Sequence, residues 1–394
     1  MTAAPRPMRS PPIRRTRPGT QCRKVVFRTG LPLTSGRLVH AARADGYPVL
    51  FSANAFARTY PKRHELAGDF RDFRLPDPAQ FAGLDAALDS AGFVAAVHYG
   101  DYRWSVHQYF DLVQAMPWAW YASMDYCVEP QVANNRGLRI LRIAATAWMY
   151  HVCAYEARRR RLPLPMPVLQ GWTPAEYVQC AKWMPIARWP RLVGIGSVCR
   201  RHVGGPHGIR AIVDALDAVL PAHVRFHYFG VKTSAMAQLA THERTASFDS
   251  QAWDFRARVE RRTGRDMPFR IAHMRSFTEQ QRALIDAPTA ASRTHFQAQL
   301  FDDLDQRGGP RRPGLAERCC EEALAWLYAE LLLSGDITYA AARRWFDRDA
   351  YAIEALIAVH GLHEALNLLD DEIVAGLSDR ARGILRAAGI VVAD

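Results

Sequence analysis

The chain has 394 residues, 49% of them apolar and 23% charged, which is ordinary for a globular protein. Its seven cysteines lack regular spacing and do not indicate a disulfide framework, so a reduced, cytoplasmic setting is expected. No apolar run reaches the ~18–20 residues of a membrane span, and the Pro- and Arg-rich N-terminus does not resemble a secretory signal.

The formal net charge of +12 is concentrated in three basic segments. Residues 1–24 hold seven basic side chains and no acidic one, so this tail is expected to be disordered because it has little to bury. The other two are the four consecutive arginines at 158–161 and the run Arg200, Arg201 and His202. Such runs are either ordinary solvated surface or contacts to the phosphates of a nucleic acid.

In the first 160 residues, short apolar runs predict strands and apolar spacing predicts helices. The predicted strands are residues 25–27, 49–51, 93–98 and 119–124. The predicted helices are residues 36–44, 81–90, 106–115 and 138–158. Asp101 and Asp125 follow the third and the fourth of these strands.

Four later apolar runs each end on a polar or glycine tip and recur about every 25 residues. They are residues 167–172, 193–201, 226–232 and 247–250. Helices are predicted to begin near Pro174, Gly208 and Ser234, with Thr173 as an N-cap. Eight strand–helix units in about 250 residues predict an α/β fold, a TIM-like (β/α)8 barrel with a helical C-terminal extension. A doubly wound open sheet is the alternative.

These patterns predict four regions along the chain. They are a basic tail at 1–24, a catalytic barrel at 25–262, an irregular connection with a polar helix at 263–314, and a helical region at 315–394. Within the last region, helices are predicted at 315–333, 350–375 and 378–388.

Polar residues at the ends of parallel strands face one common site, so Asp101, Asp125, Gln170 and Asp249 are the candidate site residues. Gly194 and Gly196 would let the backbone approach a ligand closely. A carboxylate can attack a sugar carbon or transfer protons, and it can accept both N–H groups on the edge of a guanine-like base. The plain alternative for each aspartate is a helix N-cap or a turn.

Five segments resemble the DNA-acting branch of the tRNA-guanine transglycosylase superfamily, the deoxypurine-in-DNA protein A family. They read SMDYCVEP at 123–130, PVLQGW at 167–172, GIGSVCRR at 194–201, HYFGVK at 227–232 and SFDS at 247–250. The resemblance implies that Asp249 is the nucleophile and Asp101 the general acid or base. It also implies that Asp125, Gln170 and the backbone of Gly194 and Gly196 bind the base. The family's usual Asp-Ser-Gly is matched only loosely at Asp101, where the chain continues with Tyr and Arg.

The resemblance implies a DNA-guanine transglycosylase. Such an enzyme exchanges guanine for a 7-deazaguanine, expected to be 7-cyano-7-deazaguanine, through a covalent Asp–deoxyribose intermediate. DNA, the 7-deazaguanine base and other DNA-modification proteins are the expected partners, with no membrane. A tRNA-guanine transglycosylase and a catalytically inactive barrel that binds nucleic acid or a nucleobase remain open. A generic glycosidase is a weaker alternative.

The remaining polar residues have more ordinary interpretations as well. Arg200, Arg201 and Lys232 are candidates for phosphate contacts or for plain surface charge. His227 lies in an apolar strand and is expected to be a packed, hydrogen-bonded histidine. No cofactor is predicted. The superfamily commonly carries structural zinc, but Cys319 and Cys320 are adjacent, and Glu317 stands where a further cysteine would be expected.

Overall fold

The structure, a computed structural model, describes residues 25–199, 201–261, 263–264, 266–287 and 315–360. Side chains in the last range are described for 324–349. The predicted tail at 1–24, Arg200, residues 288–314 and the predicted helices beyond 360 lie outside the described residues. None of the described helices is long and apolar enough to span a membrane.

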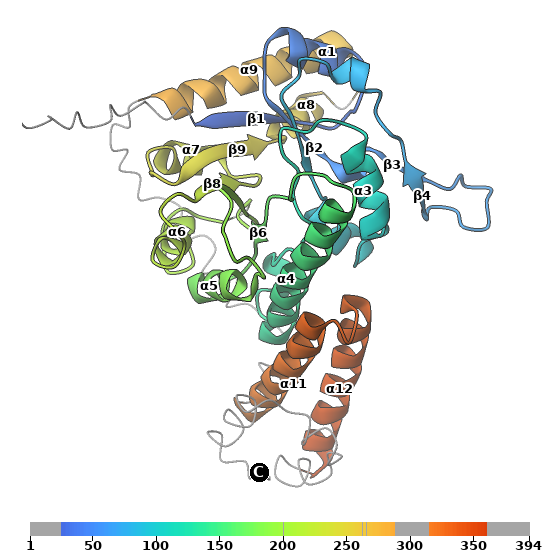
Figure 1. Ribbon diagram of the computed structural model, residues 1–394, viewed down its shortest axis with the longest axis vertical. Helices are drawn as coiled ribbons and strands as arrows, with labels where there is room; N and C mark the ends of the chain where they lie inside the picture. Colours follow the sequence, from blue (N-terminus) through green and yellow to red (C-terminus); the bar gives the residue numbers. More distant parts are fainter. Residues whose placement is uncertain (1–24, 200, 262, 265, 288–314, 361–394) are drawn as a thin grey trace, which may run out of the picture.

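A curled, parallel, seven-stranded sheet forms the centre of the molecule, in the order β5-β2-β1-β9-β8-β7-β6 (Figure 1). Its strands are β1 (Val26–Leu31), β2 (Val49–Ser52), β5 (Ala86–Asp89), β6 (Val168–Leu169), β7 (Leu192–Ile195), β8 (Arg225–Tyr228) and β9 (Thr245–Ser250). Most of their residues are buried, as expected for parallel strands that are covered on both faces. The predicted α/β class is therefore confirmed.

The segment that contains residues 119–123 connects the two edges of this sheet. Leu88 N–H donates to Trp120 C=O at 3.1 Å on one side, and Met166 N–H donates to Tyr121 C=O at 2.8 Å on the other. Two isolated parallel bridges, Leu88 with Tyr121 and Ala122 with Met166, accompany these bonds. The predicted strand at 119–124 is thus present as bridges only, and a complete (β/α)8 barrel stays a prediction.

Two predicted elements in this region are wrong. Residues 81–90 were expected to be helical, but Ala86–Asp89 forms β5, preceded by the 3-10 turn η2 (Pro78–Phe81). Residues 93–98 were expected to be a strand, but they lie in α2 (Gly92–Val94) and the π-helix η3 (Ala95–Tyr99). The run Ala86, Ala87 and Leu88 is fully buried, and a short apolar run of this kind carries no periodicity that separates a strand from a helix.

Helices surround the sheet (Figure 1). They are α1 (Arg37–Ala44), α3 (Val106–Gln114), α4 (Arg136–Arg159), α5 (Pro174–Trp183), α6 (Ile209–Asp217), α7 (Thr233–Leu239), α8 (Ala252–Glu260) and α9 (Met267–Asp286). The predicted N-cap is confirmed, since the Thr173 side chain accepts from Glu176 N–H in a capping box, with Pro174 at the first turn. The polar helix expected within 263–314 is α9, which packs on β1 through Phe277 against Phe27.

Two structures project from this body (Figure 1). The strands β3 (Ala57–Thr59) and β4 (Phe70–Phe73) form an antiparallel hairpin after β2. The helices α11 (Leu315–Ser334) and α12 (Tyr339–His360) pack against α4 around an apolar cluster that includes Leu141, Ala325 and Phe346. The helix predicted at 315–333 corresponds to α11, whereas the helix predicted at 350–375 begins earlier, at residue 339, as α12. Both lie on one helix of the body, and the rest of the predicted extension lies outside the described residues.

Candidate active site

Asp125 lies at the carboxyl end of the 119–124 segment and is 5% exposed. Ser90 Oγ donates to its Oδ1 at 2.8 Å, and Gln170 Nε2 donates to its Oδ2 at 2.5 Å. The Tyr102 hydroxyl contacts the Asp125 backbone, donating to its C=O at 2.9 Å and accepting from its N–H at 3.0 Å. Burial raises the pKa of Asp125 to about 6, against the opposing effect of the Ser90 and Gln170 hydrogen bonds.

The amide of Gln170, which follows β6, has one defined orientation. The Ser197 hydroxyl donates to Gln170 Oε1, and Ser197 Oγ itself accepts from Val128 N–H at 2.7 Å. With Oε1 occupied by a donor, the Gln170 NH₂ group must face Asp125. Ser197 has a φ of 54°, a left-handed conformation that is uncommon for a residue with a side chain. Sequence reasoning did not identify Ser197, which no apolar or charged pattern distinguishes.

Gly194 in β7 and Gly196 in the following turn leave space for neighbouring side chains that a Cβ would block. A Cβ on Gly196 would lie 2.1 Å from Gln170 Nε2, and one on Gly194 would lie 2.7 Å from the Phe229 ring. The predicted base contact through their backbones stays a prediction, and their N–H groups are already used within the sheet. Gly194 N–H donates to Pro167 C=O, Gly196 N–H donates to Leu169 C=O, and Gly196 C=O accepts from the Tyr177 hydroxyl.

Gly196→Ala is expected to displace the Gln170 amide, since a methyl cannot fit at 2.1 Å. The base binding that the resemblance implies should then weaken by about tenfold to a hundredfold. Equilibrium binding of guanine measures the effect. Gly204→Ala, in the same loop, is the matched control because a Cβ there meets nothing within 4 Å. Equal affinities of the two variants would show that the Gly196 contact is unimportant.

Asp249 lies near the carboxyl end of β9 and is 9% exposed. Gly230 N–H donates to its Oδ1 at 2.9 Å, and His227 Nε2 lies 3.4 Å from the same oxygen. Among the described residues, none forms a hydrogen bond with Oδ2. One carboxylate oxygen is therefore held by the protein and the other is available to a ligand.

A third carboxyl group, Asp89 at the end of β5, belongs to this cluster. Its Oδ2 accepts from Ala91 N–H at 3.0 Å. Burial, and then the negative charges of Asp125 and Asp249, raise the pKa of Asp89 to about 7. These interactions place three carboxyl groups together at the carboxyl ends of the strands, where a parallel α/β sheet carries its ligands.

Asp101 does not occupy the position predicted for it. It lies beyond η3 rather than at a strand end, and its Oδ1 accepts from the Tyr126 hydroxyl at 2.9 Å and from Tyr102 N–H at 2.7 Å. The error follows from the misplaced third strand, since the true strand ends at Asp89. A sequence signal was present, because Asp89 and Ser90, with Gly92 two residues later, resemble the family's Asp-Ser-Gly more closely than Asp101 does.

The raised pKa values predict how stability depends on pH. The folded Asp89 and Asp125 carboxyls titrate at about 7 and about 6, above the ~3.9 of an unfolded chain, so the folded state binds more protons between these limits. The stability contributed by their protonated forms is fully present below pH ~4 and is lost as the pH rises through 6 to 7.

We therefore compare the free energy of unfolding of Asp89→Asn with that of wild type. The difference, variant minus wild type, should be larger at pH 8 than at pH 5 by roughly 2 kcal/mol. Urea unfolding of both proteins at the two pH values measures this difference. An equal difference at both values would mean that Asp89 titrates normally.

The basic residues Arg201 and Lys232 lie in different surroundings. Arg201 is 7% exposed, and its guanidinium stacks on the Trp172 ring at 4.3 Å. The same group donates to the backbone carbonyls of Gly171, Trp172, Ser197 and His207. It joins two loops at the mouth with four of its N–H groups in use, and its phosphate contact stays a prediction. Lys232 is exposed before α7, and its phosphate contact stays a prediction.

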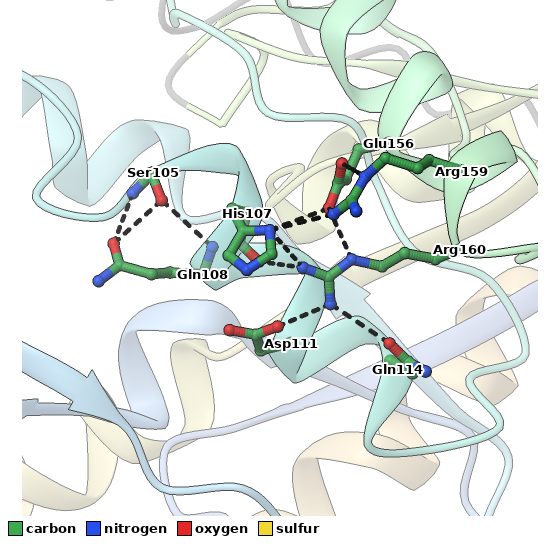
Figure 2. A network of polar contacts seen from close by, with 8 residues as sticks. All are labelled: Ser105, His107, Gln108, Asp111, Gln114, Glu156, Arg159 and Arg160. Carbon is green, nitrogen blue, oxygen red and sulfur yellow. Dashed lines mark hydrogen bonds and ion pairs between the residues drawn. The ribbon is translucent and has the colours of Figure 1, made fainter.

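Two of the four arginines at 158–161, Arg159 and Arg160, are bound to neighbouring side chains at the C-terminus of α4. Glu156 accepts from Arg159 and Arg160, and Arg160 also donates to Asp111 at 2.6 Å and to the backbone of His107 at 2.9 Å (Figure 2). The hydrogen bond from Arg159 lowers the pKa of Glu156 to about 2. This network joins the C-terminus of α4 to α3, on the side of the sheet where the strands begin. It therefore supports the fold and lies away from the carboxyl cluster.

The described residues do not fit a zinc site. No group of three or more His, Cys, Asp or Glu side chains among them could hold a metal ion. His273, the nearest imidazole in sequence to the expected zinc region, has its Nε2 3.0 Å from Glu260 Oε2. Cys319 and Cys320 lie in α11, outside the residues whose side chains are described.

Comparison with known proteins identifies the family of this chain. The family model of DeoxyPurine in DNA protein A matches residues 68–267, about half of the chain, a range that contains Asp89, Asp125, Gln170 and Asp249. No curated protein matches at a significant level. A crystal structure described as "a putative fructose-1,6-biphosphate aldolase from Coccidioides immitis" is similar at 12% identity and a TM-score of 0.28. The similarity covers 66% of this chain and 88% of that one. At this TM-score the likeness bears on neither fold nor function.

Proposed function

Because the chain belongs to the DeoxyPurine in DNA protein A family, we propose that it is a DNA-guanine transglycosylase that replaces guanine in DNA with a 7-deazaguanine. The observation that carries the proposal is the carboxyl cluster. Asp249 presents one oxygen while its other oxygen is held by Gly230 N–H, and Asp89 beside it has a pKa of about 7. A nucleophile next to a group that can both give and take a proton is what a two-step base exchange requires.

In the first step, Asp249 Oδ2 forms a bond to C1′ of the deoxyribose. The C1′–N9 bond breaks, and its electron pair goes to the departing guanine ring. Asp89 in its protonated form supplies the proton that neutralises this ring, which its pKa near 7 permits at neutral pH. The products are a deoxyribosyl ester of Asp249, free guanine and the Asp89 carboxylate.

In the second step, the deazaguanine N9 attacks C1′, and the ester bond breaks with its electron pair returning to Asp249. The proton lost from N9 passes to the Asp89 carboxylate, which restores the starting state. The incoming base is proposed to be 7-cyano-7-deazaguanine, following the resemblance. The exchange therefore needs no other reactant.

Asp125 and Gln170 are proposed to hold the edge of both purines. Each Asp125 oxygen accepts one protein hydrogen bond and keeps a lone pair for an N–H group of a guanine-like edge. Gln170 keeps one N–H for the base oxygen. Extruding the base from the duplex costs a few kcal/mol, which favourable phosphate contacts of the kind predicted for Lys232 would offset in part.

The wider architecture is proposed to serve this site. We expect residues 119–124 to complete a (β/α)8 barrel over 25–262, since they bond to β5 and to the start of β6. The helices α11 and α12 are proposed to buttress the base-binding segment. Tyr339 packs on Tyr126 with ring centroids 4.0 Å apart, and Arg142 donates to Cys127 C=O at 2.7 Å. Other DNA-modification proteins remain expected partners in the cytoplasm.

Incubation of the full chain with labelled guanine and either duplex DNA or tRNA tests the proposed function. Label should enter duplex DNA, and should enter less when unlabelled 7-cyano-7-deazaguanine competes. Label that enters tRNA alone would identify a tRNA-guanine transglycosylase. Absence of label from both nucleic acids, with guanine binding retained, would identify an inactive nucleobase-binding barrel.

A further inference from the structure

His227 is completely buried in β8, and its two ring nitrogens face two residues of β9. Nδ1 lies 2.8 Å from Ser247 Oγ, and Nε2 lies 3.4 Å from Asp249 Oδ1. At 3.4 Å, Nε2 has no well-formed hydrogen bond to any described residue. A buried nitrogen aimed at the nucleophile is more than the ordinary packed histidine expected from the sequence.

The surroundings of the ring fix its charge. The aromatic rings of Trp120 and Phe229 pack against it, with centroids 4.8 and 4.6 Å away. Burial lowers the pKa of His227, and the positive charge of Arg28 on β1 lowers it further. Asp249 has the opposite effect and raises it. The imidazole is therefore neutral near pH 7 and carries one N–H group.

The Asp249 carboxylate favours the tautomer with the proton on Nε2, and the Ser247 hydroxyl can accommodate it because it can donate as well as accept. A hydrogen on Nδ1 would leave a bare lone pair on Nε2 facing the Asp249 carboxylate, which is repulsive. When the Ser247 hydroxyl donates to Nδ1, the hydrogen lies on Nε2 and points at Asp249 Oδ1. The long distance in the free protein can shorten as the carboxylate turns toward a substrate.

We propose that His227 is a positioning residue for Asp249, whose Nε2–H group, together with Gly230 N–H, stabilises the carboxylate when it leaves the sugar in the second step. The inference rests on the proposed base exchange. Both donors contact Oδ1, so Oδ2 is left for the bond to C1′. In the ester, Oδ1 is a neutral carbonyl oxygen, a weaker acceptor than a carboxylate oxygen.

This asymmetry has a measurable consequence. The two donors stabilise the free carboxylate more than the ester, so they favour breakage of the ester bond. Loss of one donor should shift the balance between ester and carboxylate toward the ester by about tenfold, the lower range for hydrogen bonds to charged groups. Turnover should fall while the covalent DNA adduct accumulates, whereas a merely structural defect would lower both.

The test compares His227→Leu, which removes the donor, with His227→Gln, which can place an amide N–H near the Nε2 position. In steady state with duplex DNA and labelled guanine, we expect His227→Leu to lose about tenfold to a hundredfold in kcat. We also expect a several-fold higher fraction of denaturation-resistant protein–DNA adduct, and a wild-type KM for guanine. His227→Gln should stay within about fivefold of wild type in both measurements.

Several outcomes would overturn the inference and are distinct from failure of the proposed function. Suppose that wild type exchanges guanine and His227→Leu has the same kcat and adduct fraction, or has lost both. In either case, His227 does not assist the leaving carboxylate. If His227→Leu does not fold, a His227→Gln variant that behaves as an inactive enzyme with no adduct overturns the inference equally. If wild type itself exchanges no base, the proposed function fails instead.

Discussion

Asp249→Asn should abolish base exchange, with a loss of about 10⁴-fold or more, because an amide is a far weaker nucleophile than a carboxylate. Asn has the same size as Asp and can still accept from Gly230 N–H through its amide oxygen, so the fold should persist. Transfer of labelled guanine into duplex DNA measures the loss. Denaturing gels should show no covalent protein–DNA adduct with this variant.

Asp214→Asn is the matched control for Asp249→Asn. Asp214 is exposed on α6, at the outer surface, and the same substitution there should leave both exchange and adduct unchanged. Residual exchange within tenfold of wild type in Asp249→Asn would mean that another group attacks the sugar.

Asp89→Asn should lower turnover by about 10²- to 10⁴-fold, the usual range for a general acid and base. Asp101→Asn is the informative comparison, since the two aspartates differ in place and not in chemistry. Asp101 contacts Tyr126 and Tyr102, and its substitution should cost less than about tenfold. The reverse order of the two effects would restore Asp101 to the catalytic role suggested by the sequence.

The pH dependence of the first step distinguishes an acid from a merely structural carboxyl. The pKa of Asp89 is raised to about 7, so its protonated fraction falls as the pH rises above 7. The single-turnover rate of adduct formation should therefore decrease roughly tenfold per pH unit above that value. Asp89→Asn should remove this decrease. A wild-type rate that is constant from pH 6 to pH 9 would contradict the assignment.

The family and the α/β class could be predicted from the sequence because the later strands carry specific motifs at regular spacing. The match to DeoxyPurine in DNA protein A confirms the family. Asp125 and Gln170 were expected at one site, and their hydrogen bond shows that they meet. Asp249 was expected there as well, and its charge acts on Asp89.

The third strand could not be placed from hydrophobic periodicity or residue propensity, for a physical reason. β5 is only four residues long and reads Ala-Ala-Leu-Asp, and the helical turns after it are rich in Ala and Val. Neither periodicity nor propensity therefore separated the strand from the helix. The shift placed the expected proton-transfer residue at Asp101, although the strand ends at Asp89. The orientations of Ser197 and His227 depend on contacts across strands, which no local pattern encodes.

Nucleoside composition of the product DNA tests the central claim most directly. Purified protein is incubated with duplex DNA and 7-cyano-7-deazaguanine, and the DNA is digested and measured by mass spectrometry together with the free bases. We predict a deoxynucleoside of the deazaguanine and an equal amount of released guanine, both absent with Asp249→Asn. Two results would contradict the account. One is unchanged DNA with the wild-type protein under conditions where tRNA acquires the base. The other is incorporation of the deazaguanine into DNA by the Asp249→Asn variant.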